Sequence, residues 1–346
     1  MIQSYEQWLQ MKKENPGHYA RDIAQKMQIS EAELNHIRTG HDVQRLKNQV
    51  RSLLNALESV GEIKSLCRNA YAVHEHIGCL ENQHLEGHAG LILNPRGLDL
   101  RLFLSQWASV FSLCEAGPRG ERHSIQFFDH AGDSVLKLFA TENTDLKAWM
   151  HIIETFTDND NPALTIEAAE TVPLPHIATA TEATKVEAEW RAMTDVHQFF
   201  TLLNRHQLTR QQAFRLVSDD LACVVDNAAL MQILNQAKAD QNEIMVFVGN
   251  RGCVQIFTGQ IHKTDPMDNW INIFNPEFTL HLMTDAIAES WVTRKPTQDG
   301  YVTSLELFAS DGTQIAQLYG QRTEGQPESV QWRKQIEMLL DKGLAA

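Results

Sequence analysis

The sequence predicts an α+β protein built as a tandem duplication of one domain, in which a large antiparallel sheet is flanked by helices. Two observations support this fold class. Similar segments recur at a nearly constant separation along the 346 residues. Within each half, helical patterns come first, and alternating strand patterns and a closing helix follow. The strand–helix alternation of a parallel doubly wound sheet is absent.

The repeat shows in four pairs of segments. "EIKSLCRN" ends at Asn69, and "EIMVFVGN" ends at Asn250, 181 residues later. "SIQFFDHAGDSVLKLF" (124–139) corresponds to "SLELFASDGTQIAQLY" (304–319). Between them, "YAVHEHIG" matches "GCVQIFTG" and "LDLRLF" matches "FTLHLM". Four matches in the same order indicate a duplicated domain.

The elements follow in order within each half. "YARDIAQKMQISEAELNHIR" and "VHQFFTLLNRHQLTRQQAFRLV" place apolar residues at helical spacing. Strands separated by turns such as "NPRG" and "HAGD" come next, and the Asp-Gly of "SLELFASDGTQIAQLY" predicts a hairpin. A helix with a tryptophan closes each half, in "DLKAWMHIIETF" and "SVQWRKQIEMLL". We expect an N-terminal repeat over 1–160, a linker rich in proline, threonine and acidic residues over 161–186, and a C-terminal repeat over 187–346.

Composition excludes several classes of protein. The chain is 43% hydrophobic and 21% charged, as globular proteins are. It has no apolar stretch of the roughly 18 residues that a membrane helix needs, and its N-terminus has no signal-peptide pattern. A net charge of −14 argues against nucleic acid as a partner, since that partner requires a basic face. Five scattered cysteines without a CxxC motif predict free thiols and a cytoplasmic location.

Histidines in "HEHIGCLENQHLEGH" form one candidate metal site. His74 and His76 alternate on a strand and would face the same side, where they could chelate an ion. His84 and His88 follow closely. The alternative is that all four face solvent, because no HExxH motif or carboxylate partner completes a site. Motifs for a serine or cysteine nucleophile and glycine-rich nucleotide loops are also missing.

A single histidine in "WRAMTDVHQFF" (190–200) forms a second candidate site. Helical spacing would place Trp190, Met193 and His197 on one apolar face with Phe199 or Phe200, so we expect a half-embedded imidazole. The first half has no obvious counterpart of "VHQFF". By itself the pattern also fits an ordinary structural histidine.

Cations and aromatic residues elsewhere give His197 potential neighbours. "LDLRLF" places Arg101 on the same strand face as Asp99 and Phe103. Each residue of this kind alone is typical of a surface ion pair. Together they offer an imidazole, several positive charges and several rings; the further members are Arg210, Lys295, Tyr319 and Arg322.

The segments "WRAMTDVHQFF", "LDLRLF", "NRGCVQIFTG", "WVTRKPTQDG" and "QLYGQRTEGQPE" together resemble the bacterial haemin-degrading or haemin-transport proteins of the HemS/ChuS/HmuS type. The likeness covers nearly the whole chain. It implies a cytoplasmic protein with two similar halves that receives imported haem between sheet and helices. Members of such a family traffic haem, and some open its ring to release iron.

The resemblance also implies roles for individual residues. His197 matches the axial ligand of the haem iron, and Arg101 matches the arginine over the opposite iron face. Imidazole is a common haem ligand, and arginines or lysines suit the propionates. Phe103 and Phe200 are expected to wall the pocket, and His74 is a candidate for a second site. The residues expected around the haem and its propionates are Arg210, Lys295, Tyr319 and Arg322.

We therefore expect a haem-degrading oxygenase that takes haem b as its substrate, with His197 and Arg101 as its catalytic residues. No flavin or nicotinamide motif is present, so electrons would come from a separate reductase. The inner-membrane haem importer is the other expected partner, and the protein is expected to be a monomer or a dimer. A non-catalytic haem chaperone would use the same pocket. An interaction protein with purely structural histidines is the third possibility.

Overall fold

Two compact units make up the chain in this computed structural model, which describes residues 4–87, 89–117, 120–168, 179–323 and 325–343. The first unit comprises Met1–Arg68, His74–Glu170 and Gly249–Gln255. The second comprises Asn69–Val73, Thr171–Val248 and Ile256–Ala346. Among the described helices, none has the length and apolar character needed to span a bilayer.

The first unit begins with helices and continues as a sheet. Its α-helices are α1 (Tyr5–Glu14), α2 (Ala20–Met27), α3 (Glu31–Ile37), α4 (Val50–Leu57) and α5 (Leu146–Phe156). Its strands are β1 (Val43–Leu46), β2 (Gly61–Arg68), β3 (Ala72–Cys79), β4 (Gln83–His84), β5 (Gly90–Ile92), β6 (Asp99–Leu102), β7 (Trp107–Gly117), β8 (Gly120–Asp129) and β9 (Ser134–Thr144). Two short 3₁₀ turns, Glu58–Val60 and Leu104–Gln106, complete it.

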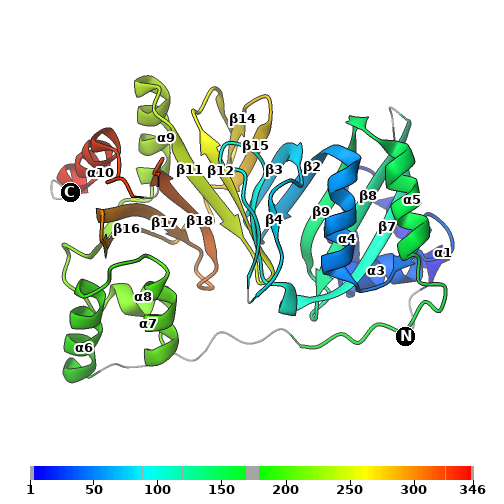
Figure 1. Cartoon of the computed structure of the whole chain (residues 1–346), viewed down its shortest axis with the longest axis horizontal. Coiled ribbons are helices and arrows are strands. Elements are labelled where there is room, and N and C mark those ends of the chain that lie inside the picture. Colours follow the sequence, from blue (N-terminus) through cyan, green and yellow to red (C-terminus); the bar gives the residue numbers. More distant parts are fainter. Residues whose placement is uncertain (1–3, 88, 118–119, 169–178, 324, 344–346) are drawn as a thin grey trace. The chain divides into compact units, whose positions relative to one another are not determined.

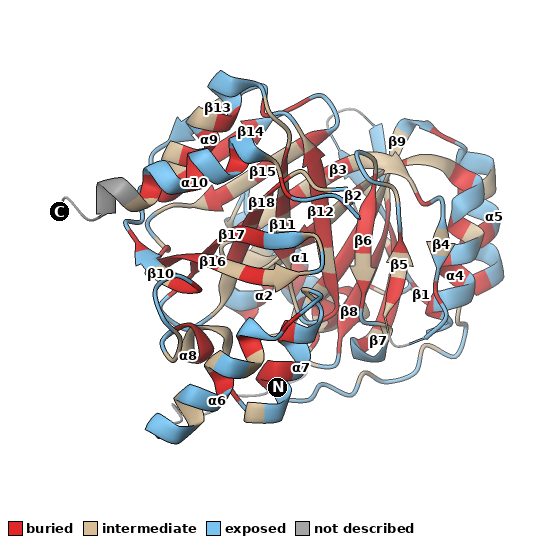
Figure 2. Cartoon of the chain, turned by 60° about the vertical axis from the view of Figure 1, so that its left-hand side comes forward, coloured by how far each residue is buried: buried red, intermediate tan, exposed pale blue. Residues whose placement is uncertain are grey.

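The strands of this unit lie in the order β1-β7-β8-β9-β2-β3, and β4, β5 and β6 form a separate run. Neighbours from β1 through β2 pair antiparallel. Helices α4 and α5 cover one face of the sheet (Figure 1). Trp149, Ile152 and Ile153 of α5 are buried there at helical spacing, whereas the outer sides of α4 and α5 are exposed (Figure 2).

The second unit repeats the same sequence of elements. Its helices are α6 (Ala180–Arg191), α7 (Gln198–His206), α8 (Arg210–Phe214), α9 (Ala229–Asp240) and α10 (Val330–Gly343). Its strands are β10 (Ala222–Val225), β11 (Ile244–Gly249), β12 (Cys253–Gly259), β13 (Thr264–Met267), β14 (Trp270–Phe274), β15 (Phe278–Met283), β16 (Glu289–Thr297), β17 (Gly300–Phe308) and β18 (Gln314–Gly320). Their order is β10-β16-β17-β18-β11-β12, with β13, β14 and β15 as a further run.

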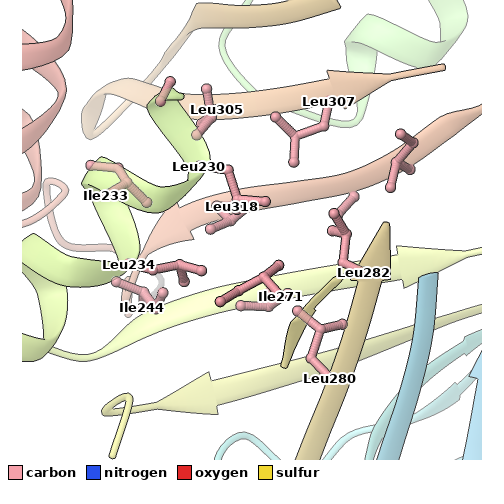
Figure 3. Packing of buried hydrophobic residues seen from close by; sticks show 14 of the residues in the cluster. Leu230, Ile233, Leu234, Ile244, Ile271, Leu280, Leu282, Leu305, Leu307 and Leu318 are labelled. Carbon is pink, nitrogen blue, oxygen red and sulfur yellow. The ribbon is translucent and has the colours of Figure 1, made fainter. Parts of the chain in front are cut away.

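Aliphatic side chains from α9 and the sheet form the core of the second unit (Figure 3). Leu230, Ile233 and Leu234 of α9 point toward the strands, where Leu305 and Leu318 are fully buried. Removing this apolar surface from water contributes about 25 cal/mol for each Å². This core therefore packs α9 against the sheet of the second unit.

The helix pairs at the start of each half form for the same local reasons. Gln28 ends α2 and Gln207 ends α7 in the left-handed conformation. Ser30 and Thr209 then cap α3 and α8, each in a reciprocal capping box with the residue three positions on. The predicted hairpin over 304–319 is also present, as β17 and β18, with Gly312 at φ +84° in its turn.

The predicted domain boundaries stay a prediction. Residues 69–73 and 249–255 each belong to the compact unit formed mainly by the other half of the chain. Helix α6 begins at Ala180, inside the segment predicted as linker, and residues 169–178 of that segment lie outside the described residues. All five cysteines are free thiols, as the sequence predicts.

Candidate functional site

His197 lies at the N-terminus of α7, in the second unit. Helix α6 ends at Arg191, the chain from 192 to 197 is not helical, and α7 begins one residue after His197. The His197 side chain is 91% exposed. The expectation of a half-embedded imidazole on one continuous helix is therefore wrong. Trp190, Met193 and Phe199 are buried, but the helix break turns His197 outward.

Asp195 holds His197 in a defined orientation. One oxygen of Asp195, Oδ1, accepts the backbone N–H of His197 at 2.7 Å and lies 2.6 Å from the ring Nδ1. A carboxylate at this position favours the tautomer that carries its proton on Nδ1 and leaves the lone pair on Nε2. The backbone N–H of His197 makes the largest contribution that lowers the pKa of Asp195, and the ring of His197 adds to it. The exposed imidazole is thus prepared to act as a ligand through Nε2.

Residues around this loop keep its shape. The Gln198 side chain accepts the backbone N–H of Thr194 at 2.8 Å. The backbone N–H of Gln298, in the turn between β16 and β17, donates to the Thr194 carbonyl at 3.0 Å. Both contacts fix the turn that presents His197. Phe200, one helical turn after His197, is 67% exposed, so a ring and an imidazole share one open face of α7.

Arg322 contributes a positive charge near this loop, because its charge helps to lower the pKa of Asp195. Its Nη2 is 3.7 Å from Asp299 Oδ2, too far for a hydrogen bond. Among the described residues, its buried Nε has no hydrogen-bond partner. A buried donor of this kind costs about 1–3 kcal/mol unless something accepts from it. An oxyanion brought by a ligand would remove that cost.

A buried carboxylate organises three of the other predicted site residues. Glu306 on β17 is fully buried and accepts Arg210 Nε at 2.9 Å and Arg210 Nη2 at 3.0 Å. Lys295 Nζ donates to the same carboxylate at 2.8 Å. Burial alone would raise the pKa of Glu306, but Arg210 and Lys295 outweigh it and lower that pKa. Two cations and one anion leave this cluster with a net charge of about +1.

The cluster lies next to the helix that presents His197. Arg210 Cζ is 5.1 Å from the centre of the Phe199 ring, and Lys295 Nζ is 4.9 Å from it. Tyr319 is also close, because burial and then the charge of Glu306 raise the pKa of its phenol. Its hydroxyl donates to Gln317 at 3.0 Å. The structure therefore groups Arg210, Lys295 and Tyr319 behind α7.

Arg101 and Phe103 belong to the first unit, so their predicted place at the haem stays a prediction. Arg101 forms an ion pair with Asp99 on its own strand, as the alternation predicts, and its side chain is 30% exposed. Burial raises the pKa of Asp99, and Arg101 opposes that rise. Phe103 is exposed, and its backbone N–H donates to the Gly252 carbonyl at 2.9 Å.

His74 and His76 lie on β3 and are buried, so the alternative that they face solvent is wrong for this pair. His74 Nδ1 accepts from Gln255 Nε2 at 2.6 Å, and Gln255 Oε1 accepts the Ser65 hydroxyl at 2.7 Å. Burial holds the pKa of His74 well below its usual range. Their chelation of an ion stays a prediction. His84 is exposed, and His88 lies outside the described residues.

The first half does contain a counterpart of His197, although it has no match to "VHQFF". His197 lies ten residues before Gln207, and His18 lies ten residues before the equivalent Gln28. His18 is exposed. However, Pro16 stands where the second half has Asp195. The first repeat thus has the histidine without the carboxylate that orients it.

Asp195 and Glu306 are candidate site residues that the sequence patterns did not indicate. Asp195 stands within the motif singled out above, two residues before His197, where an Asp side chain commonly accepts a backbone N–H two residues on. Glu306 gave no such signal, because it sits among apolar strand residues and its partners are far away in the sequence.

Comparisons with known proteins show which proteins this chain is similar to. The family description "Haemin-degrading HemS.ChuX domain" matches residues 28–156 and again 207–339, which confirms the duplication. The hemin transport protein HmuS of Yersinia pestis is 64% identical over 342 residues, covering 99% of both chains. The hemin transport protein HemS of Yersinia enterocolitica is 63% identical over the same length.

Solved structures share the fold. The heme degrading enzyme ChuS of Escherichia coli O157:H7 is 64% identical with a TM-score of 0.92, covering 97% of this chain and 98% of that one. The heme-binding protein PhuS of Pseudomonas aeruginosa, in its holo form, is 39% identical with a TM-score of 0.91, covering 97% of each chain. The predicted α+β fold with a repeated domain is confirmed.

The titration of Lys295 tests the buried cluster. Burial lowers its pKa from 10.5 to about 8, the charge of Arg210 adds to this, and Glu306 opposes it. Because the folded pKa lies below the unfolded one, the unfolded chain binds more protons between about pH 8 and 10.5. This group alone thus makes the folded state more stable as pH rises through that window. We expect the ¹³Cε resonance of Lys295, assigned with Lys295→Arg, to titrate near pH 8. If the Lys295 resonance instead titrated above pH 10, together with those of exposed lysines, the lowered pKa attributed to burial of its ammonium group would be wrong.

Proposed function

The chain belongs to the family of haemin-degrading proteins that carry the HemS/ChuX domain, and we propose that it binds haem b through His197 and degrades it oxidatively to release iron in the cytoplasm. One observation carries the proposal. His197 is an almost fully exposed imidazole whose Nδ1 is held by a carboxylate. Free cysteines are in keeping with a reducing compartment.

His197 suits the role of an axial ligand. A neutral imidazole with its Nε2 lone pair directed outward is a common protein ligand for haem iron. Its exposure lets a flat macrocycle approach without displacing the core. Phe200, on the same open face of α7, offers a ring against which the macrocycle can pack.

Asp195 sets the strength of that ligand. A carboxylate that accepts the proton of Nδ1 makes the imidazole a better electron donor at Nε2. This favours the oxidised iron over the reduced iron. Asp195 also fixes the rotation of the ring, so less side-chain entropy is lost when His197 binds the iron.

Positive groups near α7 suit the two propionates of haem. The cluster of Arg210, Lys295 and Glu306 has a net positive charge of about one, so it attracts a carboxylate although its members are already paired. Arg322 offers a buried Nε–H that nothing in the described residues accepts. We assign Arg322 the closest contact with a propionate, because that hydrogen bond would be charge-assisted and would satisfy a buried donor.

Ring opening needs molecular oxygen and reducing equivalents. Haem itself supplies the iron that activates oxygen, and the protein positions it and limits access. We propose that a separate reductase donates the electrons and that the inner-membrane haem importer delivers the substrate. The place of Arg101 over the other iron face, the wall formed by Phe103 and a second haem at His74 rest on the family resemblance.

A haem chaperone is the second candidate function. It is favoured by the names of the two Yersinia relatives, which are called hemin transport proteins, and by the heme-binding PhuS. Binding and delivery need the ligand and the propionate contacts but not turnover. The two functions thus share His197 and differ in the fate of the bound haem.

The variant His197→Ala tests the ligand. We expect wild-type protein to give a sharp Soret band with one equivalent of haemin, and the variant to lose that spectrum because it lacks the imidazole. His151→Ala, which removes an exposed histidine from α5, is the matched control and should bind like wild type. An unchanged Soret spectrum in His197→Ala would overturn the assignment of the ligand.

Asp195→Asn tests the orienting carboxylate, because it keeps the size of the side chain and removes its charge. We expect haemin affinity to fall about 10-fold or more, as when a group that accepts the ring N–H of a metal-binding histidine is removed in other proteins. The iron(III)/iron(II) midpoint potential should rise in the same variant. Asp219→Asn, at an exposed acid of the same unit, should change neither quantity. Equal affinity and potential in Asp195→Asn and wild type would show that Asp195 does not act on the ligand.

Turnover separates the oxygenase from the chaperone. The haem complex is mixed with a reductant under air, with catalase present so that free peroxide does not bleach the haem. We expect the Soret band to decay and free iron to appear, captured by a ferrous chelator. A complex that stays intact through this treatment would refute the oxygenase and leave the chaperone.

A further inference from the structure

The outer end of the β7–β8 hairpin in the first unit brings together three side chains with metal-binding chemistry. Cys114 on β7 lies directly opposite His123 on β8, and Ala116 lies opposite Glu121. Side chains that are directly opposed, or two residues apart on one strand, share a face of the sheet. Cys114, Glu121 and His123 therefore point the same way. One ligand atom from each lies within 4.8 Å of the other two.

The charges around this group favour a cation. Burial, followed by the charge and hydrogen bond of Glu121, raises the pKa of the Cys114 thiol. Glu121 Oε2 is 3.7 Å from His123 Nε2, beyond hydrogen-bond distance. Glu115, which follows Cys114 on β7, instead accepts hydrogen bonds from Arg38 Nη2 at 2.8 Å and from Arg122 Nη2 at 2.7 Å. The Glu121 carboxylate, beside the Cys114 thiol and the His123 imidazole, is thus available to a positive ion.

We propose that Cys114, Glu121 and His123 bind a divalent transition-metal ion of borderline softness, such as Zn²⁺. Thiolate, imidazole and carboxylate are the ligands that Zn²⁺ takes, at about 2.3, 2.0–2.1 and 2.0–2.2 Å respectively. Donors at such distances in a tetrahedron are about 3.5 Å apart. Rotation of the exposed Glu121 and the partly exposed His123 closes the difference from 4.8 Å. Water completes the coordination shell.

Binding at this site releases one proton. The Cys114 thiol gives up its proton to solvent, its sulfur forms a bond to the metal, and no electron is transferred. His123 binds in its neutral form, and Glu121 as a carboxylate. Affinity is therefore expected to rise with pH until the Cys114 thiol is already deprotonated in the metal-free protein. The site lies in the first unit and uses no residue assigned to haem, so it does not depend on the proposed function.

Cobalt(II) titration of the reduced, haem-free full-length protein tests the site, and His197→Ala is used as the background so that the proposed haem ligand cannot contribute. We expect one Co²⁺ per chain, with a thiolate-to-cobalt band in the near ultraviolet and strong visible bands typical of tetrahedral geometry. Binding of either ion to the metal-free protein should release about one proton in weak buffer, and Zn²⁺ should then displace Co²⁺ without further proton release. Cys114→Ser should lose the near-ultraviolet band, and His123→Ala should bind at least about 10-fold more weakly.

Cys79→Ser is the matched control, because Cys79 is another partly exposed thiol of the same unit. It should keep both the band and the affinity. Far-ultraviolet circular dichroism establishes that each variant is folded. Absence of the thiolate band in the His197→Ala background, its survival when Cys114→Ser is added, or unchanged affinity when His123→Ala is added would overturn the proposal.

Discussion

The buried carboxylate of Glu306 is the group on which the candidate site depends. It is fully buried on β17, and Arg210 from α8 and Lys295 from β16 both donate to it. Leaving it without these partners would cost several kcal/mol, because a charge would remain buried and uncompensated. The two cations in turn lie against Phe199, which anchors α7. A single ionic cluster thus links the sheet, the short helix α8 and the helix that presents His197.

In the first repeat, the ion pairs that join helix α3 to the sheet have the charges reversed relative to those of α8. Glu31 and Arg210 occupy equivalent positions, because each directly follows the serine or threonine that caps its helix. Glu31 accepts a hydrogen bond from Lys137 Nζ at 2.6 Å and also forms an ion pair with Arg68. The acid thus comes from the helix and the cations from the strands. Both halves therefore contain buried ion pairs between a helix and the sheet, which indicates that these ion pairs stabilise the fold. What distinguishes the second half is Asp195 beside the outward imidazole, since the first half has Pro16 there.

Local patterns made the repeat, the order of elements and the family predictable. Asp-Gly turns, capping residues and apolar periodicity act over a few residues, and both halves carry them. The exposure of His197 was not predicted, because helical spacing over "WRAMTDVHQFF" indicated one helix. Thr194 and Asp195 instead bind backbone and side-chain groups of the next turn and start a new helix there. The partner of Arg210 could not be found from sequence, because Glu306 lies 96 residues further on.

Resonance Raman spectroscopy of the ferrous haem complex tests the proposed roles of His197 and Asp195 most directly, through the iron–histidine stretching frequency in wild type and in Asp195→Asn. If, as proposed, Nε2 of His197 binds the iron and the Nδ1–H donates to Asp195, wild type should give an iron–histidine band. The band should shift to lower frequency in Asp195→Asn, because the imidazole donates less strongly without the carboxylate. An absent band, or one at the same frequency in both proteins, would contradict these roles.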